Sequence, residues 1–140
     1  MSVSFRVDRE RGIVRGTAEG VVGADDLIRY VDDLADSDAV ERDMPRLIDL
    51  QHTFLDVTAD DCWQIVNRVR HRGLGPTRLA IVVSDDHSHS IARMYATIAI
   101  NAHLHAEVFY DVEQAERWLL AGQRSGARGT VRESDSDPAD

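Results

Sequence analysis

Residues 46–61 read RLIDLQHTFLDVTADD, and this stretch decides the fold. Its first five residues are apolar enough for a buried strand, and the polar residues after Leu50 predict a short loop. Thr58 then starts a helix, because its hydroxyl can accept a hydrogen bond from the backbone N–H of Asp61. The stretch therefore predicts a strand, a loop and a capped helix in succession.

The same alternation continues on both sides of this stretch. The apolar run Leu79 to Val83 is typical of a strand that is covered on both faces. The whole order is strand-strand-helix-strand-helix-strand-helix-strand-helix, which predicts an α/β domain. Strands are expected at 4–7, 13–20, 46–50, 78–83 and 106–110, and helices are expected to begin near 23, 58, 88 and 111.

Composition excludes several classes of function. The 140 residues suffice for one domain, and their net charge of -9 repels nucleic acids and anionic lipid headgroups. All 16 basic residues are Arg, so a Lys nucleophile, a Schiff base and a P-loop Lys are excluded. Cys62 is the single cysteine, which excludes an intramolecular disulfide and a Cys-rich zinc site, and its place in an apolar stripe is typical of an inert buried thiol.

The two ends of the chain carry further expectations. The first residues reach a charge at Arg6, too early for the apolar region of a signal peptide, and no apolar run is long enough for a transmembrane segment. We therefore expect a cytoplasmic protein. Residues 1–121 are predicted to form the domain, and 122–140 a disordered acidic tail, because this stretch has no apolar period.

The order of elements resembles the STAS domain, and more closely its SpoIIAA-like branch, named after an anti-sigma-factor antagonist. The resemblance covers about residues 3–120. It implies an α/β fold with a mixed, largely parallel five-stranded sheet and four helices. Its carriers are the LIDL strand at 47–50, the FLDVTA segment at 54–59, LAIVVSD at 79–85, and the EVF strand at 107–109 before EQAERW at 113–118.

The resemblance also points to a modification site. Regulatory STAS proteins carry an Asp-Ser-Ser-Gly sequence where the second helix begins, and a partner kinase phosphorylates the second serine. Here Asp56 matches the acidic residue and Thr58 lies at the phosphoacceptor position, while Val57 and Ala59 replace the first serine and the glycine. Thr58 is therefore the candidate phosphoacceptor.

A second candidate site lies where parallel strands end. The loops that follow such strands meet at one edge of the sheet, beside the helix N-termini. Imidazoles and carboxylates there could bind a metal ion or serve a hydrolase-like enzyme; the competing interpretation is a solvated rim of capping residues. No nucleophile elbow, dinucleotide-binding or P-loop pattern is present, so no catalytic residue, metal or cofactor is predicted. The candidate residues are His52, Asp56, Asp85, His87 and His89.

The helix expected near 88–101 is apolar over more of its circumference than one face of a sheet covers. Its polar residues Arg93, Thr97 and Asn101 fall on one narrow stripe, because they are spaced by four. Either neighbouring helices cover the rest, or a second subunit or an apolar ligand does. The candidate interface residues are Met94, Ala96 and Ile100.

These features favour a non-catalytic STAS-like module that regulates by binding. Its partner is expected to be a protein, which includes a second copy of the chain in a homodimer, or an apolar small ligand. The alternative is a hydrolase-like or metal-dependent enzyme that uses the end of the sheet carrying His52, His87 and His89.

Overall fold

The computed structural model describes residues 3–129, and the side chains of residues 3–122. This part of the chain holds five strands, four α-helices and one short 3-10 helix. Their bounds are β1 Val3–Asp8, β2 Ile13–Gly23, α1 Ala24–Asp36, β3 Arg46–Asp56, α2 Ala59–His71, β4 Thr77–Val82, α3 Asp86–Ala99, η1 Ile100–Ala102, β5 Leu104–Phe109 and α4 Val112–Gly129. The predicted acidic tail lies mostly outside the described residues, and α4 extends beyond the end expected for it near residue 120.

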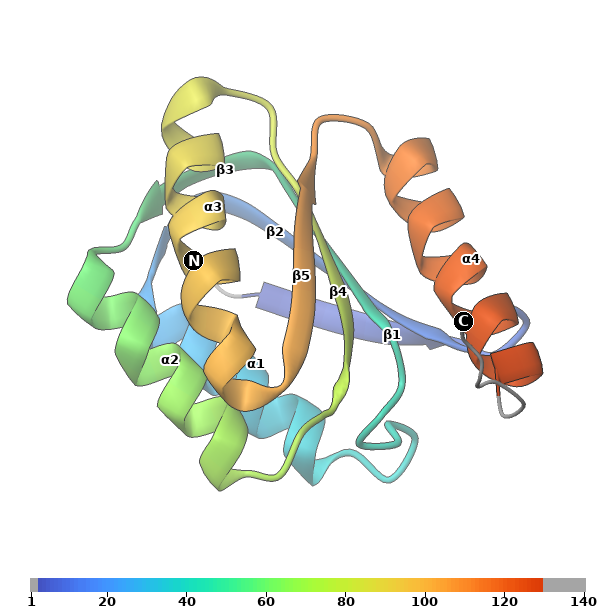
Figure 1. Cartoon of the computed structure of the whole chain (residues 1–140). Helices are drawn as coiled ribbons and strands as arrows, with labels where there is room; N and C mark the ends of the chain where they lie inside the picture. The colour runs from blue at the N-terminus through green and yellow to red at the C-terminus, as the bar shows by residue number, and fades with distance from the viewer. Residues whose placement is uncertain (1–2, 130–140) are drawn as a thin grey trace.

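The strands form one sheet in the order β1-β2-β3-β4-β5, which is also their order along the chain. β1 pairs antiparallel with β2, and the three later pairs are parallel. Each parallel connection places the next strand on the same side of the strand before it. Because such crossovers are right-handed, α1, α2 and α3 all lie on one face, and α4 returns across the other face (Figure 1). The predicted mixed, largely parallel sheet with four helices is confirmed.

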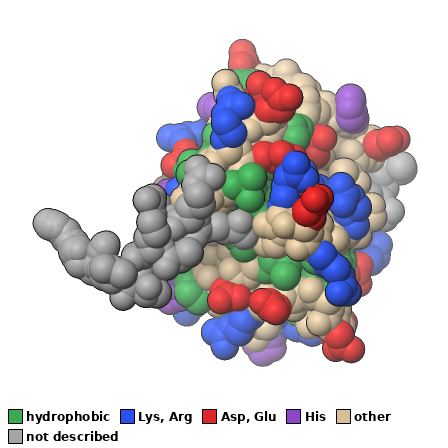
Figure 2. All heavy atoms as spheres, turned by 90° about the vertical axis from the view of Figure 1, so that its right-hand side faces the viewer, with side chains coloured by type: hydrophobic (Ala, Val, Ile, Leu, Met, Phe, Trp, Pro, Cys, Tyr) green, Lys and Arg blue, Asp and Glu red, His purple; other side chains and the backbone are tan. Residues whose placement is uncertain are grey.

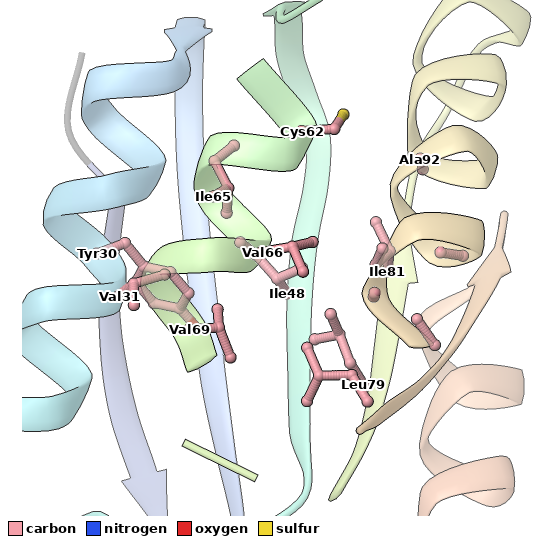
Figure 3. Packing of buried hydrophobic residues seen from close by; sticks show 14 of the residues in the cluster. Tyr30, Val31, Ile48, Cys62, Ile65, Val66, Val69, Leu79, Ile81 and Ala92 are labelled. Carbon is pink, nitrogen blue, oxygen red and sulfur yellow. The ribbon is translucent and has the colours of Figure 1, made fainter. Parts of the chain in front are cut away.

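The core is divided by the sheet into two parts of unequal size. The larger part lies between the sheet and α1–α3, where Val31, Ile65 and Ala92 from the helices face Ile48 and Ile81 of the strands (Figure 3). The smaller part lies under α4 and consists of Ile13, Leu47, Ala80, Val82, Ala115 and Leu119. β4 is buried on both faces, as its apolar run predicts, and so is the first half of β3.

The face that carries α4 has a mixed surface. Figure 2 shows acidic and basic side chains interspersed over the part of this face that is visible. Within the described part of the chain, no helix is long and apolar enough to span a bilayer.

β3 is longer than the sequence indicates. The segment 51–56, expected as a loop, continues the strand and pairs with the second half of β2. The register shifts between the pairs Thr17–Asp49 and Glu19–His52, so β3 carries one extra residue there, which is a bulge. The extra residue shifts the positions of β3 that face α1–α3 from even numbers, as at Ile48 and Leu50, to odd numbers, as at Leu55.

Candidate functional site

The loops after β3 and β4 meet at the carboxyl edge of the sheet, where α2 and α3 begin. The Thr58 hydroxyl accepts from the backbone N–H of Asp61 at 3.1 Å, and the Asp61 carboxylate accepts from the N–H of Thr58 at 2.9 Å. The Asp85 carboxylate accepts from the N–H of Ser88 at 2.7 Å, which lowers the pKa of Asp85. The helix cap predicted at Thr58 is confirmed. Its assignment as a phosphoacceptor stays a prediction.

Two histidines at this edge are each stacked on a different aromatic ring. The His87 ring lies parallel to Phe54 with 4.6 Å between ring centroids, and its Nε2 donates to the carbonyl oxygen of Leu55 at 2.9 Å. The His89 ring lies parallel to Tyr110 with 5.0 Å between centroids. The two imidazoles are two residues apart on a helix, so they point in nearly opposite directions, one toward β3 and one toward the end of β5.

The other two candidates at this edge lie along β3. His52 is opposite Glu19 of β2, and Asp56 is opposite Gly23, and both side chains are exposed. Over residues 3–129, no group of three or more His, Cys, Asp and Glu is arranged to hold a metal ion. The described residues therefore hold no assembled metal-ligand set, and His87 and His89 stack on different rings; the candidate site at this edge stays a prediction.

The apolar flanks of α3 are mostly covered within the subunit. α2 packs along one side of α3, and β5 lies under it. Ala96 is 9% exposed and Met94 is half-buried against the main core, whereas Ile100 is 68% exposed. Ala96 therefore offers little surface to a partner, because it belongs to the main core, and its place in an interface stays a prediction. Of the three candidates, Ile100 retains a large exposed surface.

A cavity of about 90 Å³ lies inside the larger core, between the sheet and α1–α3. Its walls are almost entirely aliphatic, and each of the three helices contributes to them. Four lining side chains have polar atoms, and they come from α1, β3, α2 and α3: Tyr30, Arg46, Cys62 and Tyr95.

Arg46 is the unusual member of this lining. Its side chain is 4% exposed, and its Nε has no hydrogen-bond partner among the described residues. The one hydrogen bond that it makes there is from Nη2 to the carbonyl oxygen of Arg42, at the long distance of 3.5 Å. The Tyr30 hydroxyl is likewise buried and unpartnered within that part of the chain. A buried guanidinium without a carboxylate is rare, because desolvation of a charge costs several kcal/mol.

Burial sets the protonation states in the cavity. It raises the pKa of Tyr30 to about 12 and the pKa of the Cys62 thiol to about 11, and it raises the pKa of Tyr95 well above its usual range. Burial lowers the pKa of Arg46, but a guanidinium stays protonated at neutral pH. The cavity therefore contains one positive charge beside neutral hydroxyl and thiol groups. The protonated Cys62 is a poor nucleophile, as expected for a buried thiol.

The position of Arg46 on a buried face is indicated by the sequence of β3. Arg46, Ile48 and Leu50 alternate along β3, so the period of two places Arg46 on the same buried face as two aliphatic residues. A charged residue in register with core positions indicates a buried polar site.

Comparison with known proteins identifies the fold. No model of a protein family matches the chain, and no curated protein matches it. A crystal structure from Shewanella loihica PV-4, of an uncharacterized protein from the DUF3478 family with a SpoIIAA-like fold, is similar with a TM-score of 0.59 and 16% sequence identity. The match covers 84% of this chain and 94% of that one. The chain therefore has a SpoIIAA-like fold, as the order of its elements predicts.

Proposed function

We propose that the chain is a non-catalytic binding module that takes up a small apolar molecule in the cavity between its sheet and α1–α3. The observation that carries this proposal is the cavity itself, with a volume of about 90 Å³ and aliphatic walls. Protein interiors are close-packed, and voids much larger than one water molecule are uncommon. A partly open space of this size between the sheet and three helices therefore suggests an occupant.

The free-energy cost of an empty cavity also favours an occupant. An unfilled cavity costs about 24 cal/mol per Å³, so this one costs roughly 2 kcal/mol. A single water needs about 10–15 Å³ by the same measure, so there is room for a compact organic molecule. Water is a poor occupant of the aliphatic region, because it finds few hydrogen-bond partners there.

The test compares ligand-induced stabilisation with and without the cavity. 1-Hexanol should raise the Tm of the wild-type protein, because a ligand that binds the folded state alone stabilises it. Ala92 lines the cavity from α3, so Ala92→Leu should fill part of the space and remove that increase in Tm. Ala121→Leu makes the same change at an exposed position of α4 and is the matched control. Hexanol should still raise the Tm of this variant.

Circular dichroism establishes that each variant is folded, and chemical-shift changes in NMR spectra locate the bound molecule. Hexanol that leaves the Tm and the shifts of cavity residues unchanged in the wild-type protein would contradict the proposal. Native mass spectrometry of protein purified without added ligand reports whether a molecule is already bound.

A protein partner and self-association remain predictions. Ile100 is the exposed candidate for such a contact, and its variant is considered below.

A further inference from the structure

The cavity contains a positive charge that the described part of the chain leaves without a counter-ion. Arg46 forms no ion pair with a described carboxylate, and its Nε lies buried without a partner. Three half-buried arginines are neutralised or hydrogen-bonded: Arg15 pairs with Asp8 at 3.1 Å, Arg72 pairs with Asp32 at 3.2 Å, and Arg78 donates to the carbonyl oxygen of Trp118 at 2.8 Å. The described residues therefore supply Arg46 with neither a carboxylate nor a partner for its Nε.

A second unpartnered group lies in the same cavity. The Tyr30 hydroxyl reaches from α1 to the sheet and rests against Gly16 of β2. A Cβ at position 16 would lie 2.7 Å from the hydroxyl oxygen, so only glycine leaves room for it there. Because the pKa of Tyr30 is raised to about 12, the hydroxyl is protonated at neutral pH and can donate. Arg46 and Tyr30, both in the lining of the cavity, thus each hold a buried donor that no described residue accepts from.

The chemistry of these donors selects the ligand. A guanidinium has N–H donors and no acceptor, and a carboxylate has acceptors and no donor, so the two are complementary. A charge-assisted hydrogen bond from the buried Nε would also neutralise the charge of Arg46. The remaining walls, which include Ile48, Leu79 and Ile81, are aliphatic and suit an apolar body.

We infer that the ligand of this cavity is a small organic anion, a monocarboxylate with a short aliphatic body, whose carboxylate binds Arg46 and Tyr30. This inference rests on the proposed function and names the ligand class for the same cavity. The volume of about 90 Å³ limits the body to a short chain. The single cationic group matches one negative charge, and the net charge of -9 on the chain disfavours a more highly charged anion.

The experiment compares two probes that share a six-carbon chain and differ in their heads, hexanoate and 1-hexanol. Calorimetric titration of the wild-type protein should show that hexanoate binds at least roughly tenfold more tightly than 1-hexanol. This difference is expected because a hydrogen-bonded charge pair forms out of water. Arg46→Met should abolish that preference while hexanol still binds. Arg70→Met removes an exposed guanidinium on α2, away from the cavity lining, and should change neither affinity. Tyr30→Phe, which retains the ring, should weaken hexanoate several-fold.

The ligand-free proteins give a readout that does not depend on either probe. Arg46→Met replaces an unpaired buried charge with an apolar side chain, so the Tm of the ligand-free variant should rise. A lower Tm would show that Arg46 supports the fold and would overturn the inference. Equal affinity of the wild-type protein for hexanoate and hexanol would overturn the anion inference and leave the proposed function standing. Absence of binding by both probes, with no retained molecule in native mass spectra, would overturn both.

Discussion

Thr58 shows how one hydroxyl fixes the start of a helix. It forms reciprocal hydrogen bonds with Asp61, three residues later, at the first turn of α2. An N-cap of this kind contributes about 1 kcal/mol, so Thr58→Ala should lower the free energy of unfolding by about that amount, and Thr58→Ser should change it little. Urea denaturation measures both differences. Equal loss in the two variants would mean that the methyl group, and not the hydroxyl, matters.

Residue-scale features were predictable where the interacting groups are close in sequence. The Thr58 cap depends on a residue three positions away, and Gly73 ends α2 with a φ of 71°, a conformation that favours glycine. The unpaired state of Arg46 was not predictable in this way. Its neighbours Tyr30 and Tyr95 come from α1 and α3, and they meet Arg46 only in the assembled fold.

At the scale of the element, the main error concerns β3. Its apolar alternation stops at Leu50, which indicates the end of a strand, yet the strand continues to Asp56. The bulge inserts one residue after Asp49, so the buried series resumes at Thr53 and Leu55 in the opposite phase. A search for alternating apolar residues assumes a fixed period of two and therefore misses this shift. The bulge depends on the pairing with β2, which the sequence of β3 alone does not show.

α1 and α2 are joined by a cluster of charges that gives a pH-dependent contribution to stability. Arg68 donates two hydrogen bonds of 2.8 Å to the Asp32 carboxylate, which lower its pKa below the ordinary value of 3.8. A carboxyl with a lower pKa in the folded state stabilises the fold above its unfolded pKa, and this contribution is lost as the pH falls through the folded value.

Asp32→Asn should therefore lower the free energy of unfolding at neutral pH and change it little at a pH below the folded-state pKa of Asp32. Asp33→Asn is the matched control, because it removes the same charge from an exposed neighbouring position. Urea denaturation at the two pH values measures the difference. A loss for Asp32→Asn that persists unchanged in acid would show that the effect comes from packing and not from the charge.

Two positions on the α3–η1 segment distinguish its buried flank from its exposed end. Ala96→Glu should destabilise the domain by about 3 kcal/mol or more, because the new carboxylate would be buried without a partner. Ile100→Glu should change the free energy of unfolding by no more than about 0.5 kcal/mol, since this side chain is exposed.

Light scattering tests the predicted self-association through Ile100. A wild-type dimer that becomes a monomer in Ile100→Glu supports it, and a monomeric wild-type protein at high concentration contradicts it.

At the scale of the whole molecule, the sequence predicted the α/β class, the order of elements and the resemblance to the SpoIIAA-like fold. These follow from hydrophobic periodicity and element order, which are read along the chain. The site was harder to predict, because the cavity results from the spacing of three helices above the sheet. Side chains grouped by sequence proximity, such as His87 and His89, are separated by the helix that carries them.

The central strands of the sheet contribute side chains both to the core under α1–α3 and to the core under α4. Leu47 and Val82 face α4, while Ile48 and Ile81 beside them face the larger core. Trp118 anchors α4, because its carbonyl oxygen accepts from Nη1 of Arg78 at 2.8 Å and the Arg78 guanidinium lies 3.9 Å from its ring centroid. Loss of α4 would expose the buried face of β3 and β4, so we expect both layers to unfold together.

The chain's two tryptophans make this expectation testable, since Trp63 lies on α2 and Trp118 on α4. Trp63→Phe leaves a fluorescent reporter on the α4 side, and Trp118→Phe leaves one on the three-helix side. In each variant the urea midpoint from fluorescence should equal the midpoint from far-ultraviolet circular dichroism, because cooperative unfolding gives coincident transitions. Comparison within a variant cancels the effect of the substitution on stability. A fluorescence midpoint for Trp118 that precedes the circular dichroism midpoint would show that α4 detaches before the sheet unfolds.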